Sequence, residues 1–160
     1  MDFKKILVPL DGSSVAEGAL RRTIGLAKEG ARVILLRAAE AHTLPMADAA
    51  EAQVEVVREA EEYLAGVKAR LEKAGVRDVE TSVWYGPPAE AIVEAARFRN
   101  ADLIVMSSHG RSGLGRLVLG SVAESVLRST KTAILLIREE NAPLWALGGM
   151  ARPVREEARV

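Results

Sequence analysis

Five short apolar runs alternate with longer segments in which apolar residues recur every three or four positions. The runs cover Phe3–Leu10, Arg32–Ala39, Val79–Tyr85, Leu103–Met106 and Thr132–Ile137. Short runs that are rich in β-branched and aliphatic residues are typical of strands buried on both faces of a sheet. The pattern therefore predicts five strands, most of them hidden within the molecule.

The intervening segments have the periodicity and the boundary residues of helices. Ser14 and Glu17 have the spacing of a capping box, Gly30 and Gly75 stand where helices end, and Pro88 falls in a first turn. The four predicted helices cover Ser14 to about Glu29, Ala49 to Ala74, Pro87 to Phe98 and Gly120 to Ser129.

Strict alternation of strands and helices is typical of an α/β fold in which helices cover both faces of a parallel sheet. We expect a single doubly wound five-stranded parallel sheet of order 3-2-1-4-5. Ligands bind such sheets at the carboxyl ends of the strands, where the strand order reverses. We expect the turns Pro9–Ser13 and Met106–Gly110 to flank that crevice.

Composition narrows the classes of function. The chain has 22 basic and 22 acidic residues and no cysteine, so we expect neither nucleic-acid binding nor a disulfide or thiolate site. No apolar run approaches the ~18 residues of a membrane span, and we expect a cytoplasmic protein. One domain is expected over residues 1–138. Residues 139–160, which contain Pro143 and Pro153, are expected to form an extension that is partly ordered at best.

The glycine-rich stretch after the fourth predicted strand carries the strongest functional signal. Ser107 is followed by two residues, Gly110, nine residues and then Gly120-Ser121, where a helix begins. Backbone N–H groups at a helix start favour an anion such as a phosphate. An ordinary loop with a capping box at Ser121 and Glu124 explains the same residues without a ligand.

Two better-known phosphate motifs are not met. Gly115 and Gly120 have the spacing of a Walker A loop, but no lysine precedes Ser121. The dinucleotide pattern requires clustered glycines after the first strand, where this chain has only Gly12.

The spacing of these residues resembles that of the universal stress protein family, in its ATP-binding branch. That branch carries glycine, two residues, glycine, nine residues, and then glycine with serine or threonine. The pattern is met here at Gly110 and Gly120-Ser121, while Ser107 stands at the first glycine. The segments Pro9–Ser13 and Gly86–Ile92 resemble the exits of the family's first and third strands.

The resemblance, which spans roughly residues 3–138, implies a site for an adenine nucleotide, ATP or AMP, with Mg²⁺ or Mn²⁺ bridging its phosphates. Residues at the exits of the first two strands would line adenine and ribose, and Gly120 to Val122 would hold the β- and γ-phosphates. The implied binding residues are Pro9, Leu10, Asp11, Ala38, Met106, Ser107, Ser108, His109, Gly110, Arg111, Gly120, Ser121 and Val122. Because Ser107 adds a Cβ where close approach is expected, we expect weakened binding.

Several of these residues have competing interpretations. Asp11 precedes a glycine and suits a turn as well as a ribose contact. His109 has no nucleophile to pair with and fits a structural histidine better than a catalytic one. Arg111 and Arg116 suit phosphate contacts or a solvated loop equally, and His42 alone cannot make a metal site.

The leading hypothesis is a stress-response regulatory protein that binds ATP or AMP. The resemblance also implies a homodimer, paired along the strand Thr132–Ile137. Slow ATP hydrolysis would need a base or lysine at the γ-phosphate, and none is identified in the motif loop. A phosphoacceptor receiver would need an aspartate where Trp84-Tyr85-Gly86 stands. An interaction module that has lost nucleotide binding remains the other alternative.

Overall fold

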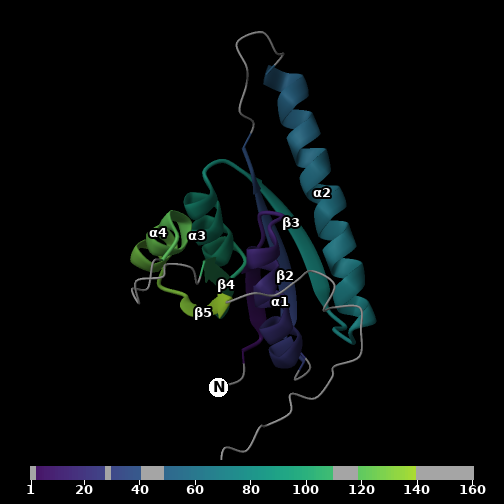
Figure 1. The fold of residues 1–160 in the computed structure, drawn as a ribbon, viewed down its shortest axis with the longest axis vertical. Coiled ribbons are helices and arrows are strands. Elements are labelled where there is room, and N and C mark those ends of the chain that lie inside the picture. The colour runs from purple at the N-terminus through teal and green to yellow at the C-terminus, as the bar shows by residue number, and fades with distance from the viewer. Residues whose placement is uncertain (1–2, 28–29, 41–48, 110–118, 140–160) are drawn as a thin grey trace, which may run out of the picture.

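The computed structural model describes residues 3–27, 30–40, 49–109 and 119–139, which form a three-layered α/β domain (Figure 1). Five strands pair in parallel in the order β3-β2-β1-β4-β5, so the predicted doubly wound sheet is confirmed. The strands are β1 (Lys5–Pro9), β2 (Arg32–Ala39), β3 (Val79–Tyr85), β4 (Leu103–His109) and β5 (Ala133–Glu139). The helices are α1 (Ser14–Ala27), α2 (Ala49–Lys73), α3 (Pro88–Phe98) and α4 (Ser121–Ser129).

Each face of the sheet is covered by two helices, and each has its own apolar core. Ile6 and Val8 of β1 pack on the α1 and α2 side, whereas Leu7 packs on the α3 and α4 side. All three side chains are fully buried, as the alternation of side chains along a strand requires when both faces are covered. This double burial explains why the strand sequences are continuous apolar runs.

The register of β1 leaves an opening at its carboxyl end. All five residues of β1 pair with β2, but only Ile6 and Leu7 pair with β4, opposite Leu103 and Ile104. Beyond these two pairs β1 and β4 separate, and their connections run to helices on opposite faces. This is the switch point at which ligands of such sheets bind.

The carboxyl end of β4 differs from the prediction. The apolar run ends at Met106, but the strand continues through Ser107, Ser108 and His109, which pair with Ile137 to Glu139 of β5. Backbone pairing extends the strand regardless of side-chain hydropathy, which is why the apolar pattern missed it. For the same reason β5 continues past its predicted end to Glu139. It begins one residue later than predicted, and β1 is shorter than the apolar run that contains it.

The capping box expected at Ser14 and Glu17 is wrong by one residue. Ser13 is the capping residue: its Oγ accepts a hydrogen bond from the backbone N–H of Ala16 at 3.1 Å. Glu17 is instead buried, and it accepts two hydrogen bonds from the Arg70 guanidinium of α2, at 2.8 and 2.9 Å. Because Arg70 lies 53 residues away, local spacing could not reveal this pair.

We predict that Arg70→Leu lowers the free energy of unfolding by about 3 kcal/mol, because it leaves the buried Glu17 carboxylate without its cation. Arg58→Leu is the matched control. It removes a solvent-exposed ion pair to Glu55 and Glu62 on the same helix and should cost under about 1 kcal/mol. Urea denaturation of both variants measures the difference, and equal costs would contradict the prediction.

Candidate functional site

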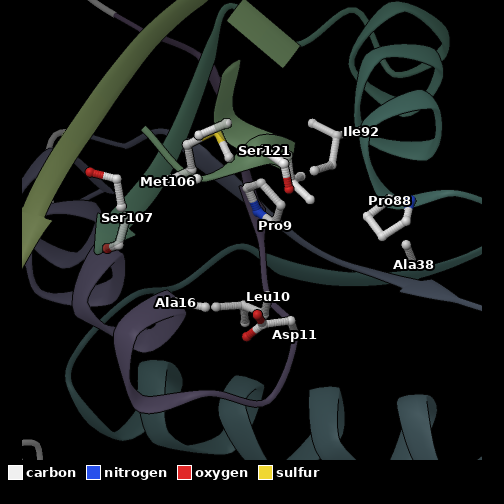
Figure 2. A pocket seen from close by; sticks show the side chains of 14 residues that line it. Pro9, Leu10, Asp11, Ala16, Ala38, Pro88, Ile92, Met106, Ser107 and Ser121 are labelled. Carbon is white, nitrogen blue, oxygen red and sulfur yellow. The ribbon is translucent and has the colours of Figure 1, made fainter. Parts of the chain in front are cut away.

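A cavity of about 270 Å³ lies at the carboxyl ends of β1 and β4, where the two strands have separated (Figure 2). Ten of the thirteen residues implied by the family resemblance line it. They are Pro9, Leu10, Asp11, Ala38, Met106, Ser107, Ser108, Gly120, Ser121 and Val122. His109 is the last residue of β4, and Gly110 and Arg111 lie outside the described residues.

Four further lining residues were not predicted from the sequence. Pro88 and Ile92 lie on one face of α3, four positions apart, while Ala16 and Ala123 lie in the first turns of α1 and α4. The sequence could have indicated Pro88 and Ile92. They lie four positions apart on one face of a helix that begins at the carboxyl edge of the sheet, where the site was expected. The two alanines carry no chemical signal of their own.

One wall of the cavity is apolar. Pro9, Leu10 and Ala38 come from the ends of β1 and β2, and Pro88 and Ile92 come from α3 (Figure 2). The backbone of Leu10 is fixed because its N–H donates to the carbonyl of Leu36 at 2.8 Å. Such a wall can hold a flat, weakly polar group such as a heteroaromatic ring.

The N-terminus of α4 also lines the cavity. The N-cap residue is Gly120, which makes no side-chain capping hydrogen bond. The alternative capping box is not formed, because the Glu124 carboxylate binds Arg128 at 2.8 Å. Ser121, Val122 and Ala123, the first three residues of the helix, all line the cavity. Their end of the helix dipole therefore favours an anion there.

Gly120 has an ordinary φ of −59°, so its backbone conformation does not require glycine. A Cβ built on it would meet no atom of the structure within 4 Å. The missing side chain therefore leaves free space at the start of the helix, where a bound group could approach the backbone closely.

Asp11 fulfils the turn role that its sequence context suggested. Its Oδ1 accepts a hydrogen bond from the backbone N–H of Ser13 at 2.8 Å, and the intervening Gly12 has a φ of +87°. The same residue lines the cavity, so the turn places a carboxylate at its edge. The two interpretations of Asp11 are thus compatible.

Ser107 lines the cavity from β4, and its Oγ is buried without a hydrogen-bond partner among the described residues. Side chains alternate along β4, and Val105 packs in the core beneath α1 and α2, so Ser107 is directed to that same face. A buried hydroxyl left unpaired costs stability.

The described lining contains no lysine, arginine or histidine, and Asp11 is its ionisable residue. Within the described part of the chain, no group of three or more His, Cys, Asp or Glu side chains gathers to form a metal site. The attraction for an anion at the described walls therefore comes from backbone N–H groups.

A parallel sheet of this order, with a cavity at the reversal of strand order and a helix start facing it, defines a doubly wound protein of the ligand-binding type. The chain belongs to the universal stress protein family, whose sequence model matches residues 2–138. The resemblance found in the sequence is thereby confirmed at the level of the family.

Individual relatives agree with this assignment. A Staphylococcus aureus protein named as a universal stress protein is 35% identical over 145 residues, which cover 88% of this chain and 87% of the relative. The solved structure of MJ0577 is 30% identical and superimposes with a TM-score of 0.75, covering 89% of this chain and all of that one. A universal stress protein in complex with cAMP is 27% identical, with a TM-score of 0.68 and coverage of 86% and 98%.

No described helix is long and apolar enough to cross a membrane.

We predict that Ser107→Ala raises the free energy of unfolding of the ligand-free protein by about 1 kcal/mol, because it removes an unpaired buried hydroxyl. Ser82→Ala is the matched control in another strand. Its hydroxyl accepts a hydrogen bond from Trp84 at 3.2 Å, so its removal should lower stability. Urea denaturation distinguishes the two, and a loss of stability in Ser107→Ala would contradict the prediction.

Proposed function

We propose that this protein binds an adenine nucleotide, ATP or AMP, in the cavity between β1 and β4 and acts as a stress-response regulator. The observation that carries the proposal is the start of α4, which has no side-chain cap and lines the same cavity as a set of apolar residues. A nucleotide has the two matching parts, a flat base and an anionic phosphate group. The relative solved with cAMP, itself an adenine nucleotide, supports the same chemistry.

The proposed pose follows the walls of the cavity. The base lies against Leu10, Ala38 and Ile92, and the Asp11 carboxylate accepts hydrogen bonds from the ribose hydroxyls. The phosphates lie at the backbone N–H groups and the hydroxyl of Ser121, with Gly120 leaving the space they need. Mg²⁺ or Mn²⁺ would bind through the phosphate oxygens.

The finer assignment to the ATP-binding branch is part of this proposal. Its support is the spacing of Gly110 and Gly120-Ser121 in the sequence, together with the position of Gly120 and Ser121 at the cavity. The departure at Ser107 lies within β4, where a serine fits the strand without disrupting its pairing to Ile137. We therefore expect the substitution to weaken nucleotide binding but not to abolish it.

We also propose that two copies pair along β5, the outer strand of the sheet next to β4. In the part of the chain that the structure describes, no further strand pairs with its outer edge, and the side chain of Leu135 is 36% exposed. An apolar edge strand of this kind needs a cover. A second β5 would supply both backbone partners and apolar contact.

We predict that Gly120→Val weakens binding of Mg-ATP at least tenfold, because its side chain would occupy the space proposed for the phosphates. Gly25→Val is the matched control, since a Cβ at Gly25 in α1 also meets nothing within 4 Å but lies away from the cavity. Isothermal titration measures both affinities. Unchanged affinity in Gly120→Val would refute the phosphate site, and no binding by the unmodified protein would refute the proposed function.

We predict that Leu135→Arg converts the proposed dimer to a monomer, because it places a charge in the apolar seam. Val54→Arg in α2 is the control, since that valine is 67% exposed and α2 packs on β2 and β3 at the other end of the sheet. Sedimentation velocity measures the mass of each variant. A monomeric unmodified protein, or a Leu135→Arg variant that stays dimeric, would contradict this mode of pairing.

A further inference from the structure

Arg37 lies next to the proposed site, on the face of the sheet that α1 and α2 cover. It precedes Ala38, which lines the cavity, and consecutive side chains of β2 point to opposite faces. Its guanidinium carbon lies 4.9 Å from the centre of the Tyr63 ring of α2, in a cation–π contact. Within the described residues, the guanidinium has no carboxylate or carbonyl partner.

The same guanidinium lies beside the turn that leads from β1 to α1. A Cβ built on Gly12 would lie 3.4 Å from Nη1 of Arg37 and 3.8 Å from its Cζ and Nη2. Gly12 has a φ of +87°, a conformation that side chains rarely adopt, so the turn presents bare backbone to Arg37. Arg37 thus lies near both the Tyr63 ring and the turn that carries Asp11.

Tyr63 is itself held in place. Its hydroxyl donates to Oε1 of the buried Glu17 at 2.9 Å, and Glu17 is bound by Arg70. Burial raises the pKa of the Tyr63 hydroxyl, and the Glu17 carboxylate raises it further, so the hydroxyl remains a donor at neutral pH. The ring therefore offers Arg37 a fixed surface that belongs to α2.

The Asp11–Ser13 turn is anchored at its two ends: the N–H of Leu10 donates to the carbonyl of Leu36 at 2.8 Å, and the carbonyl of Ser13 accepts from the N–H of Glu17 at 3.2 Å. Its internal bonds are the Asp11 to Ser13 hydrogen bond and the Ser13 cap of α1, and both Asp11 and Gly12 are exposed. These bonds hold the ends of the turn, and Arg37 lies beside the exposed Gly12 between them.

We propose that Arg37 and Tyr63 are positioning residues: they hold the Asp11–Ser13 turn against the cavity and thereby set its affinity for nucleotide. The effect on nucleotide affinity rests on the proposed function. The positioning of the turn does not, because it concerns the ligand-free protein. If the turn is not held in place before the ligand binds, it must be ordered during binding. The free energy of that ordering is subtracted from the binding free energy, so affinity falls.

The first test measures the turn in the ligand-free protein by hydrogen exchange. Arg37→Met keeps a flexible apolar stem without the charge, and it should raise exchange at least fivefold at the amides of Ser13 and Ala16, which are hydrogen-bonded within the turn. Arg22→Met, at an exposed site on α1, is the control and should leave both amides unchanged. Unaltered exchange in Arg37→Met would overturn the positioning role whether or not the protein binds nucleotide.

The second test measures affinity for Mg-ATP by isothermal titration. Arg37→Met and Tyr63→Leu should each raise Kd at least fivefold. Arg37→Lys, which retains a cation over the ring, and Tyr63→Phe, which retains the ring, should stay within twofold of the unmodified protein. If Arg37→Met alone weakened binding, Arg37 would contact the ligand directly and the positioning role would be wrong.

The two proposals fail in different ways. No heat of binding for the unmodified protein overturns the proposed function, while the exchange measurement still decides the role of Arg37. Normal affinity in Arg37→Met and Tyr63→Leu, together with weakened binding in Gly120→Val, overturns the positioning role and leaves the nucleotide site intact.

Discussion

The site depends on how briefly β1 and β4 are paired. Two residue pairs join them, opposite Leu103 and Ile104, and the strands then part while each remains paired with its other neighbour. The apolar residues around those pairs are fully buried, so the sheet is closed and packed there. It opens beyond them, at the carboxyl end of β1. The cavity is therefore a consequence of topology, and the side chains at its rim only determine which ligand it suits.

The rim combines two kinds of interaction. The apolar wall comes from strand ends and α3, whereas the polar wall is the backbone at the start of α4. Backbone donors keep their orientation without side-chain ordering, so they bind an anion at a low entropic cost. A glycine at the N-cap, with open space in place of a side chain, serves the same end.

The fold could be predicted from the sequence almost completely, because double burial makes each strand a readable apolar run. Ten residues that line the cavity, the first of them Pro9 and the last Val122, could be named in advance from the motif spacing and the family resemblance. The errors had two physical causes. Backbone pairing carried β4 past its last apolar residue, and Glu17 took a partner 53 residues away instead of a local cap. Neither a ladder of main-chain bonds nor a long-range ion pair leaves a periodic signal.

The extension of β4 has a mechanical consequence. Ser107 and Ser108 line the cavity, and they are joined in register to Ile137 and Arg138 of β5. In the described sheet, β5 is therefore the one strand between the cavity-lining serines of β4 and the outer edge of the sheet. A displacement of β5 would reach the two serines directly through main-chain hydrogen bonds, because no loop lies between the paired residues.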